Sequence, residues 1–348
     1  MEEQTVPFPY QCSELEGEDK ELVERTIAAN PIELLRLGPK GYIVFKPYMR
    51  DAENIYNMPL RPSDVFVASY QRSGTTVTQE LVWQLLNDFD YEKAKEIPLT
   101  ARYSFLEEFM FIDSEKTDIY IENAKKADPN FDPTPILMIG EMFKTPASTK
   151  LATAPSPRFI KTHLPMSFLP PKVLETAKVV YIAREPRDVA VSCYHQTLLF
   201  KVQQFEGGFK EFWNLFHRSL FTLTPFFEHL KEAWNLRHHP NMLFLFYEDV
   251  TKDKPAAIRR IAAFFGKTIT EEQVARLSDH LDIKNFKKNK SVNNEELKDS
   301  ALFDPKESFI RKGKSGGWRD YFDEEMTQQA ERWIADNLRD TDLRFPKV

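Results

Sequence analysis

The sequence predicts an α/β fold in which a central, mostly parallel sheet is flanked by helices. Short runs of β-branched and aromatic residues alternate with longer stretches in which apolar residues recur every three or four positions. Strands that alternate with helices in this way form parallel sheets joined by crossovers. The chain has 348 residues, of which 42% are hydrophobic, so it can bury a large core. We expect strands at residues 41–45, 64–70, 158–164, 178–184 and 242–249.

Two of the expected helices follow strands directly. The stretch 76–88 has an apolar stripe at helical spacing, and the stretch 186–196 begins with a proline, which favours the first turn of a helix. The same spacing predicts further helices at residues 208–222, 225–236, 254–265, 271–280 and 323–338. An aromatic stripe in the first of these is expected in the core rather than in a ligand pocket, and consists of Phe209, Phe212, Trp213 and Phe216.

The stretch 89–157 is different. It is rich in Phe, Pro and Asp, has weak periodicity and contains no evident sheet strand. We expect it to elaborate the carboxyl edge of the sheet, where open α/β folds bind their ligands. It would then serve as a lid or as an acceptor pocket.

The composition argues against several classes of function. Two cysteines, Cys12 and Cys193, are too few for a zinc quartet, and the seven histidines lack metal-helix spacing, so no metal is expected. A net charge of −6 argues against nucleic-acid binding, although residues 281–319 hold ten basic and six acidic side chains. The acidic start and the lack of a run of ~18 apolar residues predict a cytoplasmic protein without a membrane span.

The strongest local signal is the segment DVFVASYQRSGTT at residues 64–76, which reads as a strand, a polar loop and the start of a helix. Such a loop directs backbone N–H groups, hydroxyls and the positive helix end at a phosphate. It is not a Walker A loop, because Ser69 and Thr75 stand where that motif requires Gly and Lys. Without that lysine, magnesium-dependent transfer of a γ-phosphoryl group is not favoured.

A second motif, FIKTHLP at residues 159–165, ends a predicted strand. Lys161 and His163 are two residues apart and therefore project to the same side. An imidazole with a pKa near ~6.5 can take a proton from an alcohol or phenol, and a nearby ammonium group stabilises negative charge. The pair thus places a base and a cation toward one ligand.

Two further motifs supply cations. AREPRDVAVSCYH presents Arg184 at a strand end and Ser192 on the next helix, and FIRKGKSGGW forms a glycine-spaced cationic loop with Arg311, Lys312 and Gly313. Together with the loop at 64–76, they describe a ligand with two separated phosphate-like groups.

In this order, the motifs YQRSGTT, KTHLP, AREPRDVAVS, FYED and FIRKGKSGGW resemble those of the cytosolic sulfotransferases. Within that family the chain resembles the insect retinol dehydratase type, with which it shares QRSGTT, a long insertion before KTHLP, and WRDYFDEEM. The resemblance implies one domain over residues 41–348 with the P-loop-like nucleotide-binding sulfotransferase fold. Residues 1–40 would be an N-terminal extension packed on it.

The resemblance also implies a cofactor, 3′-phosphoadenosine 5′-phosphosulfate (PAPS), with adenosine 3′,5′-bisphosphate (PAP) as product. In this family His163 would be the general base, Lys161 and Arg72 would assist at the sulfuryl group, and Phe105 would line the acceptor pocket. The 5′-phosphosulfate would bind at Arg72, Ser73, Gly74, Thr75 and Thr76, the 3′-phosphate at Arg184, Ser192, Arg311, Lys312 and Gly313, and the adenine at Tyr247.

Some positions depart from the family pattern. Arg72 stands where most members have lysine, Val77 where a tryptophan stacks on adenine, and Leu281 where a polar adenine contact is common. Residues 319–328 lack the Thr-Val core of the common dimer motif, so the resemblance leaves monomer and homodimer open.

The function expected from these motifs is sulfuryl transfer to the hydroxyl of a small apolar or aromatic acceptor: a phenol, flavonoid, sterol or retinoid alcohol. The sulfate ester of an allylic alcohol such as retinol could then ionise and lose sulfate, which gives net dehydration. Two alternatives stay open at this point. A nucleoside or nucleotide kinase would need the missing P-loop lysine, and a non-catalytic nucleotide-binding module would have no use for the Lys161–His163 pair.

Overall fold

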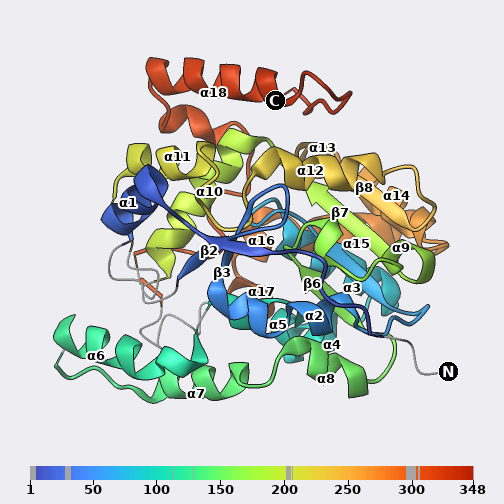
Figure 1. Ribbon diagram of the computed structural model, residues 1–348. Coiled ribbons are helices and arrows are strands. Elements are labelled where there is room, and N and C mark those ends of the chain that lie inside the picture. The colour runs from blue at the N-terminus through green and yellow to red at the C-terminus, as the bar shows by residue number, and fades with distance from the viewer. Residues whose placement is uncertain are drawn as a thin grey trace.

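The structure is a computed structural model that describes residues 5–27, 33–111, 113–127, 129–200, 205, 207–294, 303–304 and 306–347. Its centre is a five-stranded sheet in the order β5-β6-β4-β7-β8, in which every neighbouring pair is parallel. This confirms the predicted parallel sheet flanked by helices (Figure 1). The strands are β4 (Val65–Ala68), β5 (Ser104–Phe105), β6 (Phe159–Thr162), β7 (Lys178–Ala183) and β8 (Met242–Phe246).

Side chains of the central strands are buried on both faces of the sheet. In β4, Phe66 and Ala68 belong to one hydrophobic cluster, whereas Val65 and Val67 belong to another on the opposite face. Strands that are covered on both faces consist of continuous apolar residues, and such runs were the basis for predicting these strands from the sequence. The register pairs Ala68 with Thr162 of β6 and with Tyr181 of β7, so these three strands end at the same edge.

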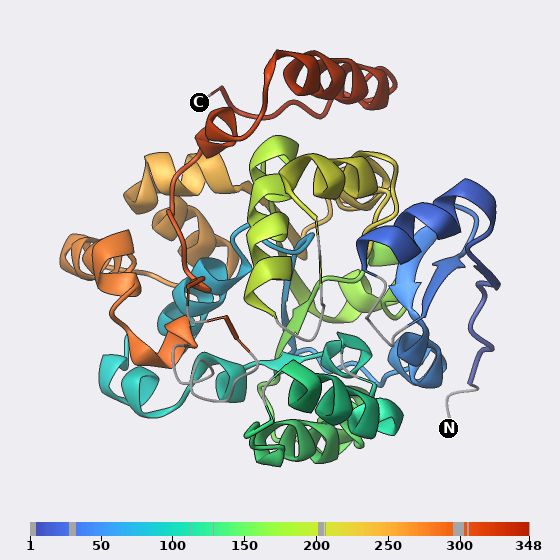
Figure 2. The same ribbon diagram turned by 90° about the vertical axis from the view of Figure 1, so that its left-hand side faces the viewer.

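The helices are α1 (Gly17–Thr26), α2 (Ala52–Tyr56), α3 (Thr75–Leu86), α4 (Tyr91–Glu96), α5 (Leu99–Arg102), α6 (Thr117–Ala127), α7 (Thr134–Phe143), α8 (Ala147–Thr153), α9 (Val173–Thr176), α10 (Pro186–Leu199), α11 (Phe209–His217), α12 (Phe226–Asn235), α13 (Tyr247–Lys252), α14 (Lys254–Phe264), α15 (Glu271–His280), α16 (Ile283–Phe286), α17 (Lys290–Asn293) and α18 (Glu324–Asn337). In both views α18 lies at the top of the molecule, and α6 and α7 lie at the bottom (Figures 1 and 2). None of the described helices is long and apolar enough to cross a membrane.

The strand predicted at residues 41–45 exists but does not join the parallel sheet. It is β3 (Tyr42–Phe45), the end strand of an antiparallel sheet with β1 (Cys12–Glu14) and β2 (Leu34–Leu37). A tight turn with positive φ at Gly38 and Gly41 joins β2 to β3, and strands joined by a tight turn must run antiparallel. The prediction of a fifth parallel strand at this position was therefore wrong.

The fifth parallel strand is instead β5, within the stretch 89–157 where no strand was expected. A strand of two residues is too short to show alternation of apolar and polar side chains in the sequence. In the structure, Ser104 and Phe105 pair with Ile160 and Lys161 at the edge of the sheet. The rest of this stretch holds α4 to α8.

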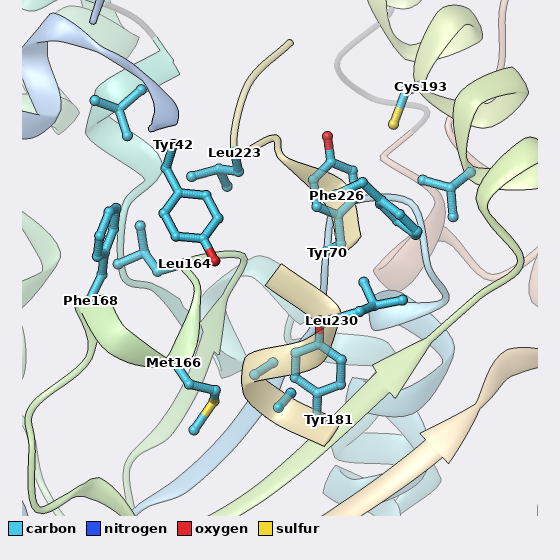
Figure 3. Packing of buried hydrophobic residues seen from close by; sticks show 14 of the residues in the cluster. Tyr42, Tyr70, Leu164, Met166, Phe168, Tyr181, Cys193, Leu223, Phe226 and Leu230 are labelled. Atoms are coloured by element: carbon cyan, nitrogen blue, oxygen red, sulfur yellow. The ribbon is translucent and has the colours of Figure 1, made fainter. Parts of the chain in front are cut away.

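Aromatic and aliphatic side chains fill the space between the sheet and the helices on one face (Figure 3). Tyr70 meets Phe226 of α12 edge to face, with ring centroids 5.0 Å apart. As predicted, the aromatic stripe of α11 is core: Phe212, Trp213 and Phe216 are fully buried, and Phe209 is partly buried. The helix ends earlier than predicted, at His217, because left-handed backbone follows at Ser219 and Leu223.

A buried ion pair joins the amino-terminal ends of β4 and β6. Both side chains are at most 1% exposed, and the Arg158 Nε donates to the Asp64 carboxylate over 2.7 Å. Arg158 also donates to the carbonyl oxygens of Leu151 and Pro59. Loss of one partner leaves an uncompensated charge in the core.

We expect Asp64→Ala to lower the free energy of unfolding by ~3–5 kcal/mol, measured by chemical denaturation. The exposed Glu92–Lys95 pair provides the control, because Glu92→Ala should cost no more than ~0.5 kcal/mol. A cost below ~1 kcal/mol for Asp64→Ala would contradict this assignment.

Candidate active site

A cavity of about 200 Å³ lies beside the loops that follow β4, β6 and β7. Its walls bring together residues that are far apart in the sequence. Of the predicted site residues it is lined by Arg72, Gly74, Thr75, Thr76, Val77, Lys161, His163, Arg184, Ser192, Tyr247, Leu281, Arg311, Lys312 and Gly313. Two predicted residues do not line it: Ser73 is fully buried in the loop, and Phe105 stands behind Lys161 and His163.

The loop between β4 and α3 needs two left-handed residues. Arg72 has φ 64° and Gly74 has φ 107°, and a Cβ atom on Gly74 would lie 2.5 Å from Cδ2 of Tyr247. α3 begins at Thr75, so the first backbone N–H groups of a twelve-residue helix face the cavity wall. The Ser73 hydroxyl is buried and has no hydrogen-bond partner among the described residues. This arrangement fits an anion, because amide and hydroxyl donors converge at a positive helix end.

Two arginines tie this loop to the other cationic segments. Arg72 donates through Nε to the Ser192 hydroxyl over 3.1 Å and through Nη2 to the Phe309 carbonyl over 2.8 Å. Arg184 donates to the carbonyl oxygens of Arg72 and Lys314, both over 3.2 Å, and its Nε is buried without a partner. Within the described part of the chain, neither guanidinium pairs with a carboxylate, so the site holds uncompensated positive charge.

Arg72 is nevertheless a cation at neutral pH. Its pKa is lowered to about 10, mainly by burial and in smaller part by the nearby charges of Arg184 and Arg311. Two desolvated positive charges close together favour an anionic ligand.

Apolar and aromatic side chains occupy the side of the cavity next to α13 and α15. Tyr247 places its ring 4.6 Å from the Arg184 guanidinium, and Val77 and Leu281 also face the space. Here Gly313 has φ 63°, and a Cβ atom on it would come within 2.3 Å of Ile283. A flat heterocycle could pack against these apolar side chains, next to the two arginines.

The imidazole of His163 is buried and held in one orientation. Its Nδ1 lies 3.0 Å from the carbonyl oxygen of Ser69 and 3.2 Å from the Ser69 hydroxyl. The carbonyl can only accept, and the hydroxyl can accept while it donates to Thr75, so we assign the hydrogen to Nδ1. Nε2 is then the free acceptor. Burial, followed by the charge of Lys161, holds the pKa of His163 well below its usual 6.5, so the ring is neutral at pH 7.

Lys161 lines the cavity together with His163. Its Nζ is 3.8 Å from the centre of the Phe105 ring, which itself lies 5.3 Å from the imidazole and 5.8 Å from Phe111. Burial lowers the pKa of Lys161, whereas the charges of Glu107 and Glu108 raise it. The charged form of Lys161 is thus opposed by burial and favoured by two nearby acids.

Several residues of the site had not been singled out from the sequence. Asp188 accepts from the backbone N–H groups of Gly316 and Trp318, over 2.6 and 3.0 Å, and fixes the cationic loop to α10. Its place in the first turn of α10 was the only available signal. Ser69 and Glu107, which hold His163, gave none, because their partners are 94 and 56 residues away.

Among the described residues no three His, Cys, Asp or Glu side chains converge as a metal site requires. The donors of the cavity are cations, amides and hydroxyls, and their chemistry is that of an anion site.

Comparison with known proteins identifies the class. The model of the family described as "Sulfotransferase domain" matches residues 62–342, and the chain belongs to this family. Sulfotransferase 1B1 of Canis lupus familiaris is 29% identical over 320 residues, covering 91% of this chain and 98% of the relative. The luciferin sulfotransferase of Photinus pyralis is 30% identical over 298 residues, covering 84% and 76%.

Two solved structures of a retinol dehydratase are more similar. One, in complex with androsterone and PAP, is 54% identical with a TM-score of 0.95 and covers 99% of this chain and 100% of that chain. The other, with retinol and PAP, is 54% identical with a TM-score of 0.94 and covers 98% and 100%. The chain is thus a PAPS-dependent sulfotransferase that transfers a sulfuryl group to the hydroxyl of a small acceptor, and the kinase alternative is not favoured.

Gly74→Ala should weaken nucleotide binding. Positive φ and the contact with Tyr247 together cost ~1–3 kcal/mol, which corresponds to a rise of roughly tenfold or more in the Kd for PAP measured by calorimetry. Gly266→Ala is the matched control, because Gly266 also has positive φ (66°) but no atom within 4 Å of an added methyl group. The Kd of Gly266→Ala for PAP should stay within about twofold of wild type. A Kd of Gly74→Ala within the same range would show that the close contact between Gly74 and Tyr247 does not matter for nucleotide binding.

Proposed function

We propose that His163 is the general base of sulfuryl transfer and that Arg72 and Lys161 stabilise the charge on the transferred and bridging oxygens. The observation that carries this proposal is the hydrogen bond from His163 Nδ1 to the Ser69 carbonyl, which leaves Nε2 as an acceptor at the cavity wall. A neutral, oriented imidazole can take the proton of an acceptor hydroxyl at neutral pH.

The same site has the donors that PAPS requires. We assign the 5′-phosphosulfate to the loop Arg72–Thr76 and the 3′-phosphate to Arg184, Ser192 and the loop 311–313. In support, Arg184 Nε is a buried donor that has no partner among the described residues, and Arg184 lines the cavity, where a phosphate oxygen would satisfy it. The adenine would lie against Val77, Tyr247 and Leu281, which form the apolar side of the cavity.

Bound PAPS supplies an electrophilic sulfur with PAP as its leaving group. His163 accepts the hydroxyl proton at Nε2 as the acceptor oxygen bonds to sulfur and the bond from sulfur to the bridging oxygen breaks. Arg72, which keeps its proton, offsets the charge on the bridging oxygen, and Lys161 offsets charge on the sulfuryl oxygens. A phosphate leaving group does not require a proton, so an arginine serves where the family pattern has lysine.

We further propose a retinoid or sterol alcohol as acceptor. The retinol dehydratase structures, 54% identical to this chain, hold androsterone and retinol. In this chain Phe105, Phe111 and Phe45 form a line of rings that begins at His163, with ring centroids 5.8 and 5.9 Å apart along the line. An apolar ring system would pack on this wall with its hydroxyl toward the base. For retinol, ionisation of the allylic ester would release sulfate and leave an allylic cation, and loss of a proton from that cation would yield a sulfate-free hydrocarbon.

We also propose a cytoplasmic enzyme, monomeric or homodimeric, with one domain over residues 41–348. Residues 1–40 would pack on it as an extension and 89–157 would form the acceptor side. The pairing of β1 with β2 and of β2 with β3 supports this arrangement, as does the presence of Leu22 and Leu215 in one hydrophobic cluster.

The test is transfer of radiolabelled sulfate from PAPS to retinol and androsterone. Wild-type protein should use at least one of them, and His163→Ala should lower turnover by ~10²–10⁴ while the Kd for PAP changes less than about threefold. His238→Ala, at an exposed histidine, serves as the control and should retain wild-type turnover. Near-normal turnover in His163→Ala would remove the base assignment, and no transfer to either alcohol would remove the acceptor class.

A further inference from the structure

We propose that Glu107 is a positioning residue for this reaction: its carboxylate fixes the end of β6 that carries His163. Nothing in the sequence motifs marks this glutamate. The inference rests on the proposed function, because it assumes that His163 and Lys161 act on the sulfuryl group and its acceptor.

The Glu107 side chain is fully buried and both of its oxygens are used. One oxygen accepts from the Thr162 hydroxyl over 2.8 Å, and the other accepts from the backbone N–H of His163. The Thr162 hydroxyl oxygen in turn accepts from the backbone N–H of Leu164 over 3.1 Å. One carboxylate thus organises three consecutive residues around the proposed base.

These bonds matter because β6 ends at Thr162, just before His163. Past the strand end the sheet no longer fixes the backbone, and a buried N–H without a partner would be costly. The imidazole is held from the other side by Ser69, and the His163 carbonyl accepts from Nε2 of His229 over 2.7 Å. Glu107 supplies the remaining backbone contact, so its loss would free the ring to tilt away from the acceptor.

The same carboxylate acts on the charge of Lys161. The charged or titratable groups that face this ammonium are Glu107, Glu108, Arg72 and His163. When ionised, the two carboxylates favour the ammonium form, whereas burial and Arg72 oppose it. Burial raises the pKa of Glu107 itself to about 7, so its full effect on Lys161 is present above neutral pH. A neutral residue in place of Glu107 should therefore lower the pKa of Lys161, and Lys161 would lose its charge at a lower pH.

Glu107 also connects the base to the acceptor wall. It lies two residues after Phe105, whose ring contacts both Lys161 and His163, and the Leu106 N–H donates to the Lys161 carbonyl over 2.9 Å. The turn that provides the aromatic wall is therefore the turn that sets the position of the base.

The experiment compares Glu107→Ala with Glu107→Gln in the sulfate-transfer assay. Glu107→Ala should lower kcat by ~100-fold, because a small misplacement of a catalytic group has an effect of this size, with the Kd for PAP within about threefold of wild type. Glu107→Gln keeps an acceptor for the His163 N–H, so its kcat should be about tenfold higher than that of Glu107→Ala. Because Glu107→Gln also removes a charge near Lys161, the alkaline limb of its plot of log kcat against pH should move to lower pH.

Glu108→Gln is the matched control. It removes the other carboxylate that faces Lys161, but among the described contacts Glu108 makes no hydrogen bond to residues 162 or 163. Its kcat should therefore exceed that of Glu107→Ala by about tenfold or more. An equal loss in both variants would overturn the positioning role.

Other outcomes are equally decisive. A kcat within about threefold of wild type for Glu107→Ala overturns the inference. An unshifted alkaline limb for Glu107→Gln also overturns it. If Glu107→Ala does not fold, the pH profile of Glu107→Gln serves as the test. Wild-type and His163→Ala enzymes are measured alongside. If wild type is inactive or His163→Ala is active, the proposed function fails, whereas active Glu107 variants beside an inactive His163→Ala overturn only the role of Glu107.

Discussion

The active site depends on the parallel pairing of β4 with β6. This register places Ala68 opposite Thr162, so the next residues, Ser69 and His163, meet at the end of the sheet and share a hydrogen bond. β7 pairs with β4 on its other side and brings Arg184 to the same edge. A slip of one residue would separate the imidazole from the anion-binding loop and turn each strand's side chains to the wrong face.

Positive charge that pairs with no carboxylate of the described residues is the second constraint. Arg72 is partly buried and Arg184 is buried beside it, and hydroxyl and carbonyl groups hold both. Such an arrangement is unfavourable until an anion arrives, and this cost makes the site selective for a ligand with two anionic groups. Burial and the charge of Lys161, with a smaller contribution from Arg72, keep the pKa of His163 low and its imidazole neutral.

Much of the architecture and of the ligand site could be predicted from the sequence, because their signals are local. The strand–loop–helix segment at 64–76, the Lys161–His163 spacing and the cationic loop at 311–313 each lie within about a dozen residues. The two-residue strand β5 could not be predicted, since it is too short to show alternation. The strand β3 was predicted, but its antiparallel pairing with β2 was not. Ser69, Glu107 and Asp188 were missed because their importance arises from partners far along the chain.

The protonation state and tautomer of His163 are measured most directly by its ¹⁵N NMR spectrum, with the signal assigned by comparison of labelled wild type with His163→Ala. At pH 7 we expect a neutral ring with the hydrogen on Nδ1 and an unprotonated Nε2, as the bond to Ser69 requires. A hydrogen on Nε2, or an imidazolium ring at this pH, would contradict the account, since neither form could accept the acceptor's proton.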